Sequence, residues 1–205
     1  MTDLFNARKL GICGAFAFLL SGLAAGPAMA ATYTPVDTSA CSAPQFTQPF
    51  LSLRDSNWYT LVPGQSVNSF QGTGWTLNGA AHIASPSLSG GGTGSVLDLP
   101  SGSSAVSPPM CVSSDYPTAR TMVRDVVGSE GVHISVAYAG TKTAAQPQDV
   151  GQVHGTQSAW TASNPFNVHP GNLPGWQLVQ FTLTPGGKSS DFQIYNFWVD
   201  PRMKG

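Results

Sequence analysis

Two segments in the second half of the chain alternate strictly between hydrophobic and polar residues. The apolar positions are Val132, Ile134, Val136 and Tyr138 in the first segment, and Val179, Phe181 and Leu183 in the second. Successive side chains of a β-strand point to opposite faces, so this period of two predicts half-buried strands at both places. His133 falls on the polar side of its strand, where we expect it to face solvent.

A third segment, residues 192–199, is apolar on both of its predicted faces. Strict alternation places Phe192, Ile194, Asn196 and Trp198 on one face and Gln193, Tyr195, Phe197 and Val199 on the other. A strand that is apolar on both faces is typical of a position in the centre of a sheet rather than at its edge. We therefore expect this last strand to be central.

Shorter apolar runs, separated by turn-forming residues, predict further strands. These runs are Tyr59–Val62, Trp75–Leu77, Val96–Leu99, Met110–Val112 and Arg120–Val127. Glycine and proline pairs or clusters, as at Pro63-Gly64 and Gly90–Gly92, lie between them and predict turns. No segment combines helical periodicity with a cap and a stop. The pattern predicts an all-β fold, an antiparallel β-sandwich of jelly-roll type.

The composition agrees with this fold class and excludes several others. Only 9% of the 205 residues are charged, whereas there are 23 glycines and 16 prolines. A helical bundle needs more charge on its exposed faces, and a chain with 41% hydrophobic residues has enough apolar side chains to avoid disorder. The net charge of −1 lacks the basic footprint of a nucleic-acid-binding protein, so we expect no nucleic-acid partner.

Residues 1–30 have the features of a secretory signal peptide. Arg8 and Lys9 precede an apolar run from Leu10 to Leu23, and Ala28-Met29-Ala30 matches a cleavage site. As a helix this run reaches about 21 Å, which is short of the roughly 30 Å hydrocarbon core of a membrane. We expect a secreted, extracellular protein without membrane contact after cleavage. Residues 31–57 then form an extended N-terminal arm, and residues 58–205 form the β-sandwich domain.

Removal of the signal peptide leaves two of the three cysteines, Cys41 and Cys111. In an oxidising compartment only one intramolecular pairing is then possible, and it would tie the arm to the sandwich. A nucleophilic or metal-binding thiol is the alternative. The two residues lack the short spacing typical of such sites, which favours a structural disulfide.

Several motifs resemble a known fold family. They are Ser56-Asn57-Trp58-Tyr59, Leu61-Val62-Pro63-Gly64, Gly74–Gly79, Ser107–Val112 and the closing run Phe192–Pro201. Together they resemble the opening and closing strands of galactose-binding-like jelly rolls, the fold of many carbohydrate-binding modules. The whole pattern is similar to a family of small secreted actinobacterial proteins. The resemblance implies a galactose-binding-like fold and no particular activity.

The chain departs from the calcium-binding relatives of this fold. In those relatives, acidic side chains of the first turn and the closing strand often bind a structural Ca²⁺. Here residues 65–71 contain no carboxylate, and the closing strand reads Ile194-Tyr195-Asn196. Ca²⁺ prefers several oxygen ligands with carboxylates among them. We expect no metal and no cofactor, although Asn68, Gln71 and Asn196 leave a weak cation site open.

The chain lacks the common catalytic motifs. Neither G-x-S-x-G nor H-E-x-x-H occurs, and Glu130 is the only glutamate. Glycosidases use two carboxyl groups, which here would have to be aspartates. The candidates are Asp55, Asp98, Asp115, Asp125, Asp149, Asp191 and Asp200, and no sequence feature selects any two of them. We predict that the protein is not an enzyme, with a small hydrolase using an aspartate pair as a remote alternative.

Aromatic residues provide the candidate ligand-binding site. Of the five tryptophans, Trp160 and Trp176 lie in polar, loop-like surroundings, whereas Trp75 and Trp198 lie in predicted strands and are expected in the core. Tyr116 and Arg120 are candidates for a polar edge beside the two loop tryptophans. We predict a non-catalytic module that binds a glycan or a cell-wall component. Loop tryptophans can also close the end of a sandwich, and a self-assembling surface protein is the alternative function.

Overall fold

The computed structural model describes residues 44–113, 118–138, 147–157, 159–168 and 176–200. Within these ranges the chain is almost entirely strand and turn, with one short 3-10 helix, η1 (Leu51–Leu53), and no α-helix. The strands are β1 (Thr60–Leu61), β2 (Gln65–Ser66), β3 (Ser69–Phe70), β4 (Thr76–Asn78), β5 (His82–Ala84), β6 (Val96–Pro100), β7 (Ser104–Val106), β8 (Met110–Ser113), β9 (Thr118–Val127), β10 (Val132–Tyr138), β11 (Gln148–Val153), β12 (Thr161–Ala162), β13 (Phe166–Asn167), β14 (Trp176–Pro185) and β15 (Asp191–Asp200).

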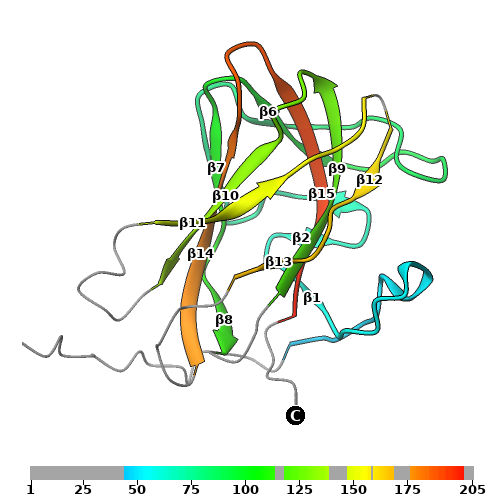
Figure 1. Ribbon diagram of the computed structural model, residues 1–205, viewed down its shortest axis with the longest axis vertical. Coiled ribbons are helices and arrows are strands. Elements are labelled where there is room, and N and C mark those ends of the chain that lie inside the picture. The colour runs from blue at the N-terminus through cyan, green and yellow to red at the C-terminus, as the bar shows by residue number, and fades with distance from the viewer. Residues whose placement is uncertain (1–43, 114–117, 139–146, 158, 169–175, 201–205) are drawn as a thin grey trace, which may run out of the picture. The chain divides into compact units, whose positions relative to one another are not determined.

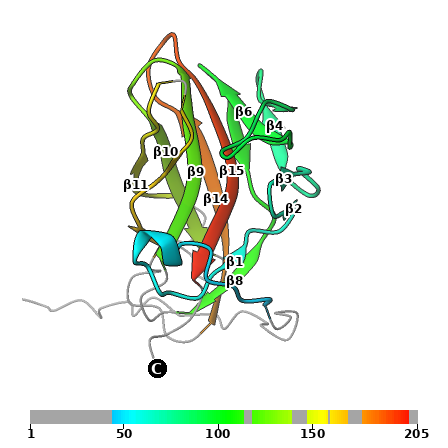
Figure 2. The same ribbon diagram turned by 90° about the vertical axis from the view of Figure 1, so that its right-hand side faces the viewer.

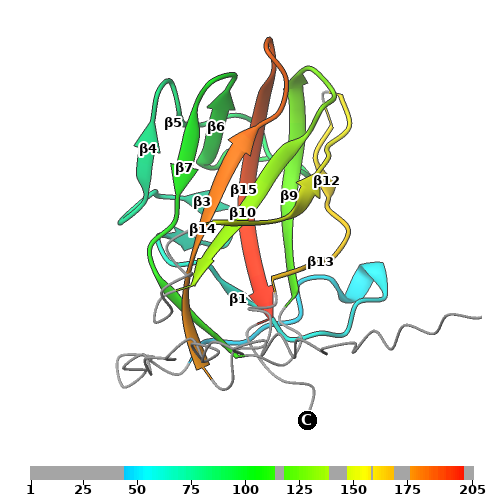
Figure 3. The ribbon, with the colours of Figure 1, turned by 60° about the vertical axis from the view of Figure 1, so that its left-hand side comes forward.

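The strands form two main antiparallel sheets that pack face to face (Figures 1 and 3). The first sheet has the order β12-β9-β15-β6-β5, with β1 paired to β15 and β13 paired to β9. The second sheet has the order β11-β10-β14-β7-β4, with β8 paired to β14. The chain crosses repeatedly between the sheets, as at β6 to β7, β8 to β9 and β14 to β15. The predicted antiparallel β-sandwich of jelly-roll type is confirmed.

The two alternating segments form neighbouring strands with the predicted faces. Strands β10 and β14 pair in continuous antiparallel register, from Val132 opposite Pro185 to Tyr138 opposite Val179. Their apolar side chains are buried, and His133 lies on the opposite side, with its side chain 48% exposed. The period of two was therefore enough to assign these strands and their faces.

Strand β15 occupies the centre of the first sheet, as predicted, but its faces differ from strict alternation. The register with β9 shifts between Tyr195 and Trp198, and Asn196 adopts a positive φ of 52°. The bulge turns Phe197 into the main core and Trp198 to the outer face of the sheet. The prediction that Ile194 and Trp198 share a face is thus wrong. An extra residue in a strand reverses every side chain that follows it.

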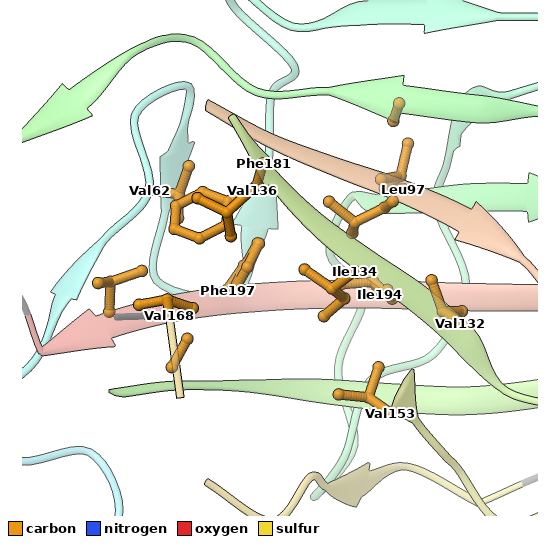
Figure 4. Close-up of a cluster of buried hydrophobic side chains, with 14 of the residues drawn as sticks. Val62, Leu97, Val132, Ile134, Val136, Val153, Val168, Phe181, Ile194 and Phe197 are labelled. Carbon is orange, nitrogen blue, oxygen red and sulfur yellow. The ribbon is translucent and has the colours of Figure 1, made fainter. Parts of the chain in front are cut away.

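The core lies between the two sheets (Figure 4). Ile194 and Phe197 of β15 meet Ile134 and Phe181 of the second sheet, and all four side chains are fully buried. The rings of Phe181 and Phe197 pack with centroids 5.0 Å apart. Trp75 is buried in the same cluster, in agreement with the sequence analysis. Aromatic and branched aliphatic side chains therefore hold the two sheets together.

Residues 44–57, which we call the N-terminal segment, pack against the end of the first sheet near β1 (Figure 2). Thr47 forms a bridge with Tyr59, and Phe50 is buried against Tyr59 and Trp198. The rings of Phe50 and Tyr59 meet edge to face with centroids 5.2 Å apart. Trp198, which the bulge moves out of the main core, is therefore covered by this segment rather than by solvent.

Candidate functional site

Four polar residues on neighbouring strands form a row on the outer face of the first sheet. His82 of β5 lies opposite Asp98 of β6. Gln193 of β15, the strand between β6 and β9, lies opposite Asp98 on one side and Arg124 of β9 on the other. Residues that face each other across a ladder project from the same side of the sheet, and their neighbours along these strands belong to the core. We call these four residues the polar row.

Contacts join the members of the polar row into one network. Nδ1 of His82 lies 3.7 Å from Oδ2 of Asp98. The Nε2 amide of Gln193 donates a hydrogen bond to Oδ1 of Asp98, and a guanidinium nitrogen of Arg124 donates to Oε1 of Gln193. The Gln193 amide thus bridges a carboxylate and a guanidinium, and these two charges fix which way its oxygen and nitrogen point.

The polar row is buried in its middle and more exposed at its two ends. Asp98 and Gln193 are only 5% and 8% exposed. Arg124 is half-buried, whereas the side chain of His82 is 59% exposed. Nε of Arg124 is buried and has no hydrogen-bond partner within the described chain. Native proteins leave few buried polar atoms unpaired, so this atom is an exception within the row.

Asp191 adds a second carboxyl group beside Asp98. It lies two residues before Gln193 on β15, opposite Pro100 of β6, and is therefore a diagonal neighbour of Asp98 on the same ladder. Burial raises the pKa of Asp191, and so do the negative charge of Asp98 and a hydrogen bond between the two carboxyl groups. Oδ1 of Asp191 is buried without a partner among the described residues. The fold thus selects one aspartate pair, which the sequence did not.

Trp160 lies beside the polar row and is half-buried. The guanidinium carbon of Arg124 lies 4.8 Å from the centroid of its ring, a cation–π contact. Its ring also meets that of Tyr195 at 88°, with centroids 4.6 Å apart, and Nε1 donates a hydrogen bond of 2.9 Å to the carbonyl of Ser87. Trp160 therefore combines a fixed orientation with partial exposure, next to charged groups.

Arg120 lies in a second polar cluster, at the end of the sheet covered by the N-terminal segment. It is only 6% exposed. Its Nη1 donates to Oδ2 of Asp55 at 2.8 Å, its Nε donates to the carbonyl of Ser163 at 2.8 Å, and its guanidinium lies 4.4 Å from the centre of the Phe50 ring. These contacts tie the segment to the sheet. A ligand-binding role for Arg120 stays a prediction, and the site described here does not include it.

Asp55 receives further hydrogen bonds in this cluster, from Tyr59 Oη at 2.8 Å and from the backbone amide of Asn57 at 3.1 Å. Burial alone would raise the pKa of Asp55, but the hydrogen bonds from Arg120, Tyr59 and Asn57 outweigh it and hold that pKa below its usual range. Burial and the bond to Asp55 raise the pKa of Tyr59 to about 12. We call Arg120, Asp55, Tyr59 and Phe50 the latch.

The other predicted site residues are not tested. Tyr116 and Cys41 lie outside the described residues, as do the predicted signal peptide and the arm before residue 44. Trp176 is the first residue of β14, but its side chain is not among those that the structure describes. Cys111 lies on β8. The disulfide between Cys41 and Cys111 therefore stays a prediction.

Of the oxygen ligands considered for a weak cation site, those of Asn68 and Asn196 are used within the fold. Asn196 accepts a hydrogen bond from the backbone amide of Asn68 at 2.7 Å and donates to its side-chain oxygen at 2.9 Å. Gln71 donates to Ser66 Oγ at 2.6 Å. The described residues include no group of three or more His, Cys, Asp or Glu side chains suited to a metal ion. Over those same residues, no helix has the length and apolar character to span a membrane.

Comparisons with solved structures find carbohydrate-binding modules at low similarity. No protein-family model matches the chain, and no curated protein matches its sequence. The CBM22-1 xylan-binding domain of Xyn10C from Paenibacillus barcinonensis is 13% identical, with a TM-score of 0.42 over 64% of this chain and 88% of that chain. The family 11 carbohydrate-binding module of the cellulase Lic26A-Cel5E of Clostridium thermocellum is 12% identical, with a TM-score of 0.37 over 80% and 99% of the two chains. Similarity at this level carries no argument about a ligand.

Proposed function

We propose that the protein is a secreted, non-catalytic module that binds a glycan or another hydroxyl-rich component of a cell surface. The observation that carries this proposal is the placement of a half-buried tryptophan, Trp160, beside a row of carboxylate, amide, guanidinium and imidazole side chains on one sheet face. Secretion rests on residues 1–30 of the sequence.

An aromatic ring beside polar side chains suits the two kinds of surface that a sugar presents. The C–H groups of a pyranose ring form an apolar face that packs on an aromatic ring, whereas its hydroxyls both donate and accept hydrogen bonds. In the polar row, Asp98 accepts, Arg124 donates, and His82 offers its Nε2 at the exposed end, while its Nδ1 contacts the Ala80 carbonyl. The neighbouring Asp191 adds further acceptor oxygens.

The test is retention on immobilised glycans and on cell-wall preparations. We expect Trp160→Ala to weaken retention about tenfold or more, because truncation of a packed aromatic anchor commonly costs more than 1 kcal/mol and each 1.4 kcal/mol is a factor of ten. His82→Ala, at the exposed end of the row, is expected to weaken retention without affecting the fold. Trp58→Ala is the matched control, because Trp58 is 49% exposed and lies outside the site. Equal retention of all three variants and the wild type would contradict the proposal.

Self-assembly is the second candidate function, and exposed apolar side chains favour it. Leu51, Leu53 and Trp58, in and after the 3-10 helix, each have about half of their surface exposed. Light scattering across a concentration series distinguishes the two functions. A binding module stays monomeric, whereas an assembling protein forms larger species, which Leu51→Ser and Leu53→Ser would abolish.

A further inference from the structure

Gln193 connects the buried carboxylate of the polar row to its arginine. It is only 8% exposed. Its Nε2 donates a hydrogen bond to Oδ1 of Asp98, and its Oε1 accepts one from Arg124. The strand register agrees with these contacts, because Gln193 lies opposite Asp98 on one side and opposite Arg124 on the other. A primary amide has distinct donor and acceptor ends, so it bridges these two groups in one orientation only.

Asp98 anchors this bridge. It lies in β6 between Leu97 and Leu99, whose side chains belong to the core, and it is itself only 5% exposed. Its carboxylate accepts hydrogen bonds, so the Gln193 amide turns its nitrogen toward β6 and its oxygen toward β9. Hydrogen bonds to a charged group are roughly twice as strong as neutral ones. The amide oxygen is thereby held where the guanidinium of Arg124 binds it.

Arg124 connects the bridge to Trp160. One of its guanidinium nitrogens donates to Gln193, and its guanidinium carbon lies 4.8 Å from the centroid of the indole ring. The guanidinium is planar and rigid, so a hydrogen bond at one nitrogen restricts the whole plane. The ring of Tyr195 and the carbonyl of Ser87 hold the indole from other directions. The orientation of Trp160 therefore depends on Arg124 as well as on these two contacts.

We propose that Gln193 is the positioning residue of the candidate site and that Asp98, acting through it, sets the place of Arg124 over Trp160. This role requires no contact between Gln193 and a ligand, because the residue acts by holding the arginine. The ligand then binds to the surface that Arg124 and Trp160 form together. That last step rests on the proposed function, whereas the arrangement of the side chains in the free protein does not.

Exchange of the carboxylate and the amide tests the order of these contacts. Gln193→Glu places a second carboxylate against that of Asp98, and the repulsion between them displaces residue 193 from Arg124. Asp98→Asn alone keeps an oxygen that accepts from the Gln193 amide. In the double variant the amide at position 98 donates to the carboxylate at position 193, which still accepts from Arg124. We therefore expect Asp98→Asn to rescue Gln193→Glu, so that the two changes are not additive.

NMR of the free protein provides the readout. Protons that lie over an aromatic ring are shifted upfield by its ring current, so the side-chain protons of Arg124 report whether it lies over Trp160. We expect this upfield shift in the wild type and in Asp98→Asn, its loss in Gln193→Glu and its return in the double variant. Gln148→Glu is the matched control, because it makes the same change at an exposed residue of β11 on the other sheet.

An unchanged Arg124 signal in Gln193→Glu would overturn the proposal, and so would a double variant that fails to restore it. If Gln193→Glu does not fold, Gln193→Met replaces it, because methionine has a similar volume and lacks the amide. The Arg124 shift is then expected to be lost whether residue 98 is Asp or Asn. Persistence of the shift in Gln193→Met would overturn the proposal equally.

Retention on immobilised neutral polysaccharides and on cell-wall preparations tests the link to binding. We expect Gln193→Glu to weaken retention about tenfold and the double variant to regain most of the loss. Wild-type retention in Gln193→Glu, together with a displaced Arg124, would overturn the link between positioning and binding. Absence of retention of the wild type on every probe would contradict the proposed function, whereas the NMR measurements decide the positioning role by themselves.

Discussion

The outer face of the first sheet carries two polar clusters that contain the same kinds of side chain and differ in how fully these are paired. In the latch, Asp55 accepts hydrogen bonds from Arg120, Tyr59 and a backbone amide, and its pKa is lowered. In the polar row and at the neighbouring Asp191, Nε of Arg124 and Oδ1 of Asp191 are buried without a partner among the described residues, and the pKa of Asp191 is raised. Both clusters combine an arginine, an aspartate and an aromatic ring. They differ in that the carboxylate of Asp55 is fully engaged by donors, whereas one oxygen of Asp191 is not engaged within the described chain.

This difference separates a structural cluster from a candidate binding site. The N-terminal segment covers the latch and uses its polar groups to bind itself to the sheet. No corresponding segment of the described chain satisfies the polar row. Buried polar groups that lack partners cost stability, and proteins commonly tolerate such costs at functional sites. The comparison therefore favours a structural role for the latch and agrees with the proposed ligand-binding role of the row.

The largest predicted effect is on the latch. Arg120→Ala leaves Asp55 buried without its cation, and removing one partner of a buried pair typically costs about 3–5 kcal/mol. We expect a loss of that size in the free energy of unfolding, measured by urea denaturation. Lys188→Ala, which removes an exposed cation, is the control. Equal stability of the two variants would show that the latch contributes no more than a surface charge.

The two aspartates are predicted to give opposite pH dependences. Because the pKa of Asp55 is lowered in the fold, its stabilisation is present above the ordinary pKa of about 3.9 and is lost as the pH falls through the lowered value. Because the pKa of Asp191 is raised in the fold, its stabilisation is present below the ordinary pKa and is lost as the pH rises through the raised value. We expect the free energy of unfolding of Asp55→Asn to lack the decrease that the wild type shows as the pH falls. We expect that of Asp191→Asn to lack the decrease that the wild type shows as the pH rises. Urea denaturation at several acidic and neutral pH values measures both. If both variants lost the same part of the pH dependence, the opposite roles of Asp55 and Asp191 would be contradicted.

The smallest predicted effect on stability is at the exposed end of the polar row. His82→Ala removes a side chain that is 59% exposed and is expected to change the free energy of unfolding by no more than about 0.5 kcal/mol. The same urea titration provides the measurement. A cost comparable to that of Arg120→Ala would mean that the row is a second structural cluster.

Sequence patterns predicted the framework of the fold well, because the framework depends on local alternation. Strands β10 and β14 followed directly from their period of two, and β15 from its apolar character on both faces. The bulge at Asn196 was not predictable in this way, since its positive φ accompanies contacts with Asn68, 128 residues away in the chain. Strands β5 and β7 were missed because three residues are too short to show a period, and the equally short β4 was found only through its apolar Trp75 and Leu77.

The candidate site was predicted only in part. Trp160 was identified from its polar, loop-like surroundings, but its partners come from strands whose pairing the sequence does not encode locally. Gln193 and Asp98, for example, are 95 residues apart. One signal was present, because Asp98 is a lone carboxylate in the apolar run Val96–Leu99 and Arg124 interrupts another strand. Charged residues inside predicted strands were thus better pointers than aspartates in turns.

The central claim, that the polar row with Trp160 is the binding site, is tested most directly by NMR shift mapping of the wild-type protein with soluble glycan fragments. We expect the largest shifts at the Trp160 indole N–H and at Arg124 and Gln193, with little change at the Trp58 indole N–H in the same spectrum. Shifts concentrated at Trp58 and the N-terminal segment, with an unchanged Trp160 signal, would contradict it.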